Sequence, residues 1–237
     1  MKTIELSARM QALVNMVSEG RRVCDVGCDH GWVSIYLIQK GIADKVYAMD
    51  VRTGPLERAK EHIARYQLEE IIEARLSDGL ANLQAGEADC MICAGMGGPL
   101  MMKILTEGRE KAKVMKELIL QPQSELALFR KFLREEGYKI VAEDMVLEDG
   151  KFYPMMKVKP VKEVECVASD NEEQELWDAY GEYLLKEKHP VLKHYLLKGR
   201  EQAQSLLQHL KEKGTASERI LQLQKELELL EKAMGYM

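Results

Sequence analysis

The sequence has no long apolar run, few prolines and few aromatic residues. None of its 237 residues falls in an uninterrupted apolar stretch of about 18 residues, the length that a membrane-spanning helix needs. The opening residues also show no apolar core of the kind that signal peptides have. We therefore expect a cytoplasmic protein with no membrane partner.

The cysteine pattern fits neither a disulfide framework nor a zinc site. The five cysteines are an odd number, and no second pair with flanking histidines accompanies the C-x-x-C of Cys90 and Cys93. That pair lies in an apolar run typical of a strand, where residues three apart point to opposite faces. We expect free thiols and no metal.

Neither sign of charge dominates the chain. Its 34 basic and 39 acidic residues give a net charge of −5. Residues 1–160 carry 23 basic and 24 acidic residues, and residues 161–237 carry 11 and 15. This balance gives no bulk attraction to nucleic acid, so a polyanionic partner would need a local basic patch.

Apolar runs and amphipathic runs alternate between residues 21 and 160. The expected strands cover residues 22–26, 45–50, 71–76, 88–94 and 118–120, and the expected helices cover 32–40, 55–66 and 124–136. Such alternation predicts a doubly wound parallel sheet with helices on both faces. Ser124 is expected to be the N-cap of the last helix.

The end of this unit breaks the alternation. Two strand-like runs, 138–147 and 151–160, flank Asp149-Gly150, which is a strong hairpin signal. A parallel sheet that closes with an antiparallel hairpin resembles the sheet of the Rossmann-like S-adenosylmethionine methyltransferases. We therefore expect residues 1–160 to form an α/β, Rossmann-like, seven-stranded methyltransferase domain.

Residues 161–237 differ from the preceding unit in composition and spacing, and they are expected to form a small α-helical coiled-coil domain. After a polar linker at 163–173, a helix should begin with Leu176, Tyr180 and Leu184. Residues 192–210 and 220–234 then place apolar residues at the alternating spacing of three and four typical of a coiled-coil seam. A short turn at Lys213-Gly214-Thr215 would make these two helices antiparallel neighbours. The seam residues expected in the core are Leu192, Leu196, Gly199, Ala203, Leu206, Leu210, Ile220, Leu223, Leu227, Leu230 and Met234.

Glycines and aspartates gather where the expected strands end. The first strand leads into Asp25-Val26-Gly27-Cys28-Asp29-His30-Gly31, and Asp50 ends the second. A glycine turn there is the nucleotide site of this architecture, and a carboxylate after the second strand can accept both ribose hydroxyls. A dinucleotide fingerprint would need glycine where Asp29 stands. Two aspartates would repel a pyrophosphate but suit ammonium and sulfonium cations, which favours S-adenosylmethionine over NAD.

Two further strand ends agree with this interpretation. Ser77-Asp78-Gly79 follows the third strand, and Gly95-Met96-Gly97-Gly98 follows the fourth. Each of these motifs alone occurs in many α/β proteins. Four motifs at the ends of four successive strands, in the correct order, predict one cofactor site. The predicted cofactor-binding residues are Asp25, Gly27, Asp29, His30, Gly31, Asp50, Val51, Asp78, Gly79, Ala94, Gly95 and Met96.

These motifs resemble the bacterial tRNA (adenine-22-N1)-methyltransferase family, known as TrmK. The resemblance extends from Leu6 through residues 121–123 into the C-terminal helices. The family's first loop often has alanine where this chain has Gly31. The resemblance implies an S-adenosylmethionine-dependent enzyme that methylates N1 of an adenine in the D-loop region of tRNA.

The predicted catalytic residues are Asp29 and His30. N1 of neutral adenine carries a free lone pair, so the reaction needs positioning and stabilisation of the charge that develops on the base. Asp29 could stabilise that charge, and His30 could bond the cofactor carboxylate or the base. Alternatively, His30 is a helix-start residue that bonds only its own loop.

Binding of tRNA requires phosphate contacts, and the segment 186–200 carries a local excess of basic residues. The predicted substrate-binding residues are Gly97, Gly98, Arg9, Lys193, Lys198 and Arg200. Tyr153 and Phe152 could stack a base, although core packing is the alternative for at least one of them. The basic segment could equally be an ordinary solvated helix face.

Two rival functions stay open. One is a methyltransferase of the same fold that acts on another RNA, a protein or a small molecule. The other is a non-catalytic, nucleotide-sensing RNA-binding module. We expect a monomer rather than a dimer, although the exposed helical seams leave a dimer open.

Overall fold

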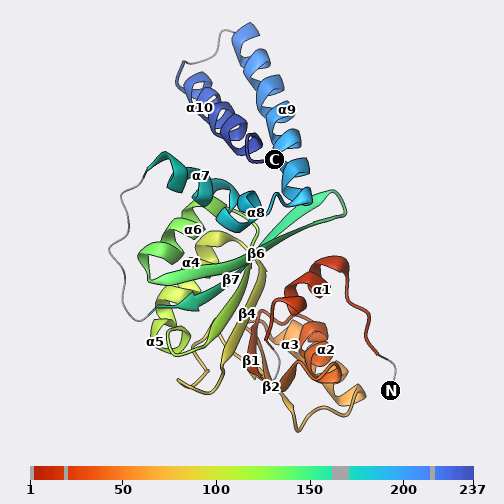
Figure 1. Cartoon of the computed structure of the whole chain (residues 1–237). Helices are drawn as coiled ribbons and strands as arrows, with labels where there is room; N and C mark the ends of the chain where they lie inside the picture. Colours follow the sequence, from red (N-terminus) through yellow and green to blue (C-terminus); the bar gives the residue numbers. More distant parts are fainter. Residues whose placement is uncertain (1–2, 19–20, 162–170, 214–216) are drawn as a thin grey trace. The chain divides into compact units, whose positions relative to one another are not determined.

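The computed structural model describes residues 3–18, 21–161, 171–213 and 217–237. The chain divides into two compact units, Met1–Val167 and Ala168–Met237 (Figure 1). Cys166 and most of the expected linker lie outside the described residues, as do Gly214 and Thr215 of the expected turn. The domain boundary at residue 160 stays a prediction.

The first unit contains the expected seven-stranded sheet. Its strands are β1 (Arg21–Val26), β2 (Ala43–Asp50), β3 (Ile72–Leu76), β4 (Cys90–Met96), β5 (Glu117–Pro122), β6 (Tyr138–Glu148) and β7 (Lys151–Pro160). Their order is β3-β2-β1-β4-β5-β7-β6, and β7 pairs antiparallel with both of its neighbours. Asp149 and Gly150 both have positive φ, as the tight turn between β6 and β7 requires. The doubly wound sheet with a closing hairpin is thus confirmed.

Helices cover both faces of this sheet. One face carries α1 (Ala8–Asn15), α2 (Trp32–Gln39) and α3 (Thr53–Arg65), and the other carries α4 (Gly98–Glu107), α5 (Arg109–Ala112) and α6 (Leu126–Glu135) (Figure 1). Cys90 lies in the core under α1–α3, and Cys93 lies in the core on the opposite face. These two thiols therefore point away from each other, as expected of strand residues three apart.

Within the described ranges, no group of side chains could hold a metal ion. The same ranges contain no helix that is both long and apolar enough to cross a membrane.

The prediction that Ser124 is the N-cap of α6 is wrong. The helix begins at Leu126, and Glu125 before it adopts a left-handed conformation with φ 53°. The hydroxyl of Ser124 instead accepts a hydrogen bond from the backbone N–H of Gly98 at 3.3 Å. Ser124 therefore links the start of α4 to the segment before α6.

The second unit contains α7 (Glu172–Tyr180), α8 (Glu182–Lys186), α9 (Pro190–Glu212) and α10 (Ser217–Met234). The single helix expected before Pro190 is broken in two at Gly181, whose φ is 93°. A Cβ on Gly199, in the first half of α9, would lie 3.5 Å from Leu230, in the last half of α10. The two long helices are therefore antiparallel neighbours, as expected.

The apolar seam between α9 and α10 is only partly buried. Leu192, Leu196 and Ala203 of α9 are buried, whereas Leu206 is 39% exposed. The expectation that the whole leucine stripe is core is wrong at Leu206. The coiled coil itself stays a prediction.

Candidate active site at the carboxyl ends of the strands

The sheet order changes direction between β1 and β4, and this is where an open α/β sheet binds its ligand. From β1 the chain moves outward to β2 and β3, and it then returns to place β4 on the other side of β1. The loops after β1 and β4 therefore flank one crevice at the carboxyl ends of the strands. The two glycine-containing motifs predicted from the sequence lie in these loops.

The loop after β1 needs glycine at two positions. Gly27 has φ 78°, and a Cβ there would lie 2.2 Å from the terminal methyl of Met96. Gly31 has φ 74° and is the N-cap of α2, and a Cβ there would lie 3.2 Å from the Cβ of Ala59. Both residues have a backbone conformation that side chains rarely adopt, so the loop stays narrow and open to a ligand.

Two carboxylates lie beneath this loop. The Asp50 side chain is buried and accepts hydrogen bonds from the backbone N–H of Arg52 at 2.8 Å and of Asp29 at 3.4 Å. Asp25 is also buried and accepts a hydrogen bond from the Ser34 hydroxyl at 2.7 Å. Burial, together with the nearby Asp50 charge, raises the pKa of Asp25 to about 6, and the hydrogen bond from Ser34 opposes this rise.

The predicted catalytic pair is in contact at the tip of the loop. His30 Nε2 lies 3.5 Å from a carboxylate oxygen of Asp29, whose side chain is 59% exposed. The carbonyl of His30 accepts a hydrogen bond from His62 Nδ1 at 2.9 Å, and the His62 ring stacks on Trp32 with centroids 4.0 Å apart. His62 of α3 thus supports the loop backbone and leaves the His30 ring to interact with Asp29.

The strand ends after β2 and β3 present an apolar side chain and a carboxylate. Val51 is 60% exposed, although its side chain is apolar, and Asp78 is exposed as well. Gly79 is buried with φ 53°, and a Cβ there would lie 3.0 Å from Ile104. These three predicted residues therefore follow β2 and β3 at the same edge of the sheet.

The loop after β4 brings together residues that are far apart in the sequence. Gly95 has φ 77°, and the position of a Cβ there is 3.6 Å from Arg9 Nη2 and 3.7 Å from Gln123 Nε2. The Arg9 guanidinium lies over the Tyr153 ring, 4.7 Å from its centroid. Arg9, predicted to bind substrate, is therefore placed at the Gly95 loop, together with one of the two aromatic residues considered for base stacking.

The next two glycines of this loop hold α4 against the chain before α6. A Cβ on Gly97 would lie 3.2 Å from the Ser124 hydroxyl, and a Cβ on Gly98 would lie 2.5 Å from the Ser124 carbonyl oxygen. Gly98 is buried as well. The close approach favours a structural role for Gly98.

The predicted basic residues of α9 do not all share one side of the helix. Lys193 and Arg200 are seven residues apart, which is about two helical turns, so they lie on the same side. Lys198 is five residues from Lys193 and is therefore rotated by about 140° around the helix. Lys193 and Lys198 are exposed, whereas Arg200 is half-buried and its Nε has no hydrogen-bond partner among the described residues.

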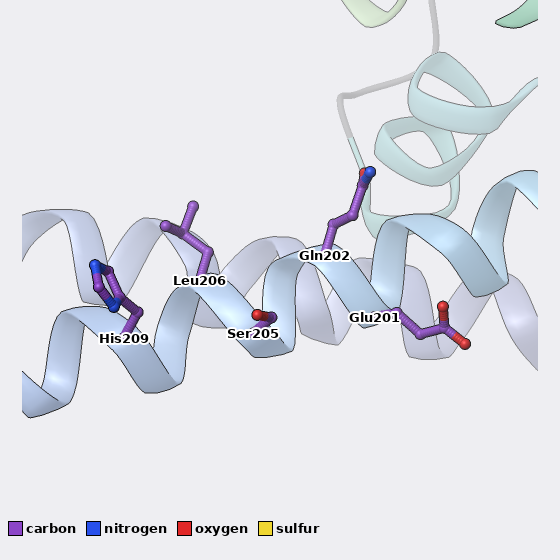
Figure 2. A pocket seen from close by; sticks show the side chains of 5 residues that line it. All are labelled: Glu201, Gln202, Ser205, Leu206 and His209. Atoms are coloured by element: carbon purple, nitrogen blue, oxygen red, sulfur yellow. The ribbon is translucent and has the colours of Figure 1, made fainter. Parts of the chain in front are cut away.

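The side of α9 that carries Lys198 borders a hollow of about 500 Å³. Five side chains of this helix line it, and all five project from α9 (Figure 2). They are Glu201, Gln202, Ser205, Leu206 and His209. None of them was predicted to be functional.

A second pocket, of about 630 Å³, adjoins the loop after β1. Its volume falls in the range of small-molecule sites. Asp29 and His30 line it together with residues 3–7 and the aromatic side chains of Trp32 and Tyr66. The sequence analysis did not predict that the N-terminal segment comes this close to the predicted catalytic pair.

The residues present fit S-adenosylmethionine. The buried Asp50 carboxylate suits a ribose diol, and the exposed Val51 next to it offers an apolar surface for an adenine. The buried Asp25 carboxylate suits a cation. The space over Gly27 is filled by the terminal methyl of Met96, the end of a flexible side chain that can move aside.

Sequence reasoning missed Ser34, His62, Gln123 and Ser124. Ser34 and His62 lie inside helices and act through contacts with the loop after β1, so no local motif marks them. Gln123 follows β5 directly, and its place at the end of a strand was a usable signal.

Comparisons with known proteins agree with this geometry. The family described as "Methyltransferase domain" matches residues 6–156. The tRNA (adenine(22)-N(1))-methyltransferase of Bacillus subtilis is 33% identical over 156 residues, which are 66% of this chain and 66% of that protein, slightly less than two thirds.

Solved structures match over nearly the whole chain. A Streptococcus pneumoniae structure described as a putative tRNA (m1A22) methyltransferase in complex with S-adenosyl-L-methionine is 28% identical, with a TM-score of 0.85 over 97% of this chain and 100% of that one. The Bacillus subtilis TrmK structure is 26% identical, with a TM-score of 0.85 over 97% and 99% of the two chains. The protein therefore belongs to the methyltransferase-domain family, and the resemblance to the TrmK family that its motifs indicate is confirmed.

Proposed function

We propose that the protein is a tRNA (adenine(22)-N(1))-methyltransferase, which transfers a methyl group from S-adenosylmethionine to N1 of an adenine in the D-loop region of tRNA. The observation that carries this proposal is the convergence of the loops after β1 and β4 with Asp50 at one edge of the sheet. Relatives with this fold are named for the same reaction.

The cofactor site is assigned to the predicted residues. Asp50 would hold the ribose hydroxyls, Asp25 the ammonium group, and Val51 and Asp78 the adenine. Gly27 and Gly95 leave the backbone open to the cofactor, Gly31 and Gly79 let their loops pack closely on Ala59 and Ile104, and the small side chain of Ala94 lies next to Gly95; Met96 covers Gly27. When bound, S-adenosylmethionine supplies an electrophilic methyl group on a sulfonium.

The remaining residues position the target base. The N1 lone pair of adenine is free at neutral pH, so no base needs to remove a proton before methyl transfer. The product is cationic, and the exposed Asp29 carboxylate stabilises that charge electrostatically while His30 orients Asp29. Gly97, in the loop after β4, leaves room for the base, whereas Gly98 holds the start of α4 against Ser124.

Contacts with tRNA phosphates are assigned to Arg9, Lys193, Lys198 and Arg200. A structured tRNA base must leave its stack to reach the crevice, which costs a few kcal/mol, and phosphate contacts offset this cost. A tRNA substrate also fits a cytoplasmic location, and we propose that the enzyme acts as a monomer.

The test is methyl transfer from labelled S-adenosylmethionine to unmodified bulk bacterial tRNA, followed by digestion and nucleoside chromatography. We expect the label in 1-methyladenosine, and none in a tRNA whose adenine 22 has been replaced by another base. Label in another nucleoside would contradict the adenine-N1 assignment. If the cofactor binds but no tRNA is labelled, the substrate is not tRNA.

A further inference from the structure

The structure places two polar side chains, those of Gln123 and Arg9, beside Gly95 in the loop after β4. The Gln123 amide and the Arg9 guanidinium both lie within 4 Å of the same point, the Cβ position of Gly95. Gln123 is exposed, and within the described ranges its side-chain amide makes no hydrogen bond. Arg9 has no carboxylate partner in those ranges; its Nη2 lies 3.8 Å from the sulfur of Met10.

The backbone holds Gln123 firmly in this place. Its N–H donates to the carbonyl of Met96 at 2.9 Å, which joins the end of β5 to the loop after β4. Gln121, two residues earlier in β5, is fully buried, and its Oε1 has no hydrogen-bond partner within the described ranges. Of these two amides only that of Gln123 is exposed, so Gln123 is the one that a base entering at Gly95 can reach.

The chemistry of the proposed reaction restricts how adenine can be recognised. N1 must keep its lone pair free to form the new C–N bond, so no donor from the protein can bind N1. Recognition is therefore left to the exocyclic amine and N7 on the adjacent edge. An amide side chain matches that edge with two hydrogen bonds, because its oxygen accepts from N6–H and its nitrogen donates to N7.

The two groups at Gly95 differ in how they suit the transition state. As N1 gains the methyl group, positive charge spreads over the base and makes N6–H a stronger donor, so an acceptor on N6 stabilises the transition state more than the ground state. A guanidinium at the base would oppose the same charge. Arg9 therefore suits a phosphate or a cofactor carboxylate, and Gln123 suits the base.

We propose that Gln123 is the residue that recognises the target adenine, with Oε1 accepting a hydrogen bond from its N6 amine and Nε2 donating to N7. This inference rests on the proposed function and adds a base-specificity residue to the same site.

The test combines an enzyme variant with a base variant. One tRNA carries adenosine at the target position, and a second carries purine riboside, which lacks the amine. With adenosine, Gln123→Ala should lower kcat/KM by roughly 10- to 100-fold, with a substantial part of the loss in kcat. With purine riboside, the loss should be clearly smaller, about fivefold or less, because the hydrogen bond to N6 is already missing and only the one to N7 can still be lost.

Two further variants complete the design. Gln123→Glu keeps an acceptor at the same place and should retain most of the preference for adenosine over purine riboside. Gln84→Ala removes an exposed amide from the loop before β4 and should match the wild type with both tRNAs. S-adenosylmethionine affinity, measured by calorimetry without tRNA, should be equal in all four proteins and reports on folding.

Equal losses with both tRNAs, or no loss with adenosine, would overturn the assignment of Gln123. The wild-type protein tests the proposed function separately. If it leaves adenosine N1 unmethylated, the proposed function fails and the assignment of Gln123 fails with it.

Discussion

Among single residues, Asp25 shows a conflict between stability and binding. Its carboxyl is buried, which raises its pKa to about 6, so keeping it ionised above that pH costs folding free energy. Because the pKa in the folded state exceeds the unfolded value, this cost is absent below about pH 4, grows as the pH rises from 4 to 6, and is constant above that. A cationic ligand group beside Asp25 would offset part of this free-energy cost by stabilising the ionised carboxylate.

We expect Asp25→Asn to raise the free energy of unfolding by about 1–3 kcal/mol at pH 7.5 and by much less at pH 4.5. Loss of the charge should also weaken S-adenosylmethionine binding by roughly 10-fold or more. Urea unfolding at both pH values and calorimetry measure the two effects, with the exposed Asp44→Asn as the control. A variant less stable than the wild type at pH 7.5 would contradict this account.

Glu117, at the amino-terminal end of β5, is a buried carboxylate whose pKa is lowered, whereas that of Asp25 is raised. It accepts hydrogen bonds from the backbone N–H and hydroxyl of Ser18, at 2.8 and 2.9 Å, and Lys157 Nζ lies 2.9 Å away. Burial alone would raise its pKa, but these partners outweigh burial and lower it. Its contribution to stability is therefore present above about pH 4.5 and lost as the pH falls below that value.

Glu117→Gln should lower the free energy of unfolding by about 3 kcal/mol at neutral pH, since it leaves Lys157 without its charged partner. The difference in unfolding free energy between this variant and the wild type should be smaller at acidic pH, where Glu117 becomes protonated in the wild type. Urea unfolding across the pH range measures it, and Glu110→Gln, at an exposed position, should change little. An equal deficit at pH 7 and pH 3 would show that charge is not the cause.

At the level of elements, the start of α4 and the segment before α6 depend on each other. Ser124 accepts a hydrogen bond from the Gly98 N–H, and the Ser124 carbonyl oxygen occupies the space that a Gly98 side chain would need. The loop after β4 ends at this contact. A shift of α4 would therefore move Gly95 and its neighbours.

Gly98→Ala should destabilise the protein by about 2 kcal/mol and lower kcat more than it weakens cofactor binding, because the loop after β4 shifts while Asp50 stays in place. Thermal unfolding and steady-state kinetics test both effects. Gly54→Ala is the matched control, since a Cβ at Gly54 in α3 meets nothing within 4 Å. Unchanged kinetics in Gly98→Ala would show that the α4 contact does not control the loop.

At the level of the whole molecule, the proposed functions are divided between two units. The first unit holds the proposed cofactor site, and the second holds the proposed phosphate-binding residues Lys193, Lys198 and Arg200. Lys193 and Arg200 lie on one side of α9, and Lys198 lies on another. The two sides can therefore be tested separately.

The double variant Lys193→Glu with Arg200→Glu should weaken tRNA binding by roughly 10-fold or more at low salt. The slope of log affinity against log salt concentration should become shallower by about two, the value expected for the loss of two phosphate contacts. S-adenosylmethionine affinity should stay at the wild-type value. Filter binding over a salt series measures the first effect, and Lys198→Glu alone shows whether the other side of α9 takes part. Unchanged tRNA affinity in the double variant would remove this side of α9 from the interface.

The sequence by itself determined the fold class and most of the proposed cofactor site. Strand and helix periodicities and the Asp-Gly turn are local patterns, and they predicted a doubly wound sheet that closes with a hairpin. Residues such as Asp50 and Gly27 were found because the ends of successive parallel strands meet at one edge of a sheet. Local patterns were less reliable at element ends, where Ser124 bonds a distant backbone group instead of capping its own helix.

Only the tertiary structure decided which distant residues share the crevice. Arg9, Gln123 and Gly95 come together because α1 packs against β6 while β5 runs beside β4, and contacts of this kind leave no periodic trace in a sequence. The same reason explains the support of the His30 backbone by His62 and the exposure of Leu206 in an otherwise apolar stripe. A sequence pattern specifies the face on which a residue lies, whereas packing decides what that face meets.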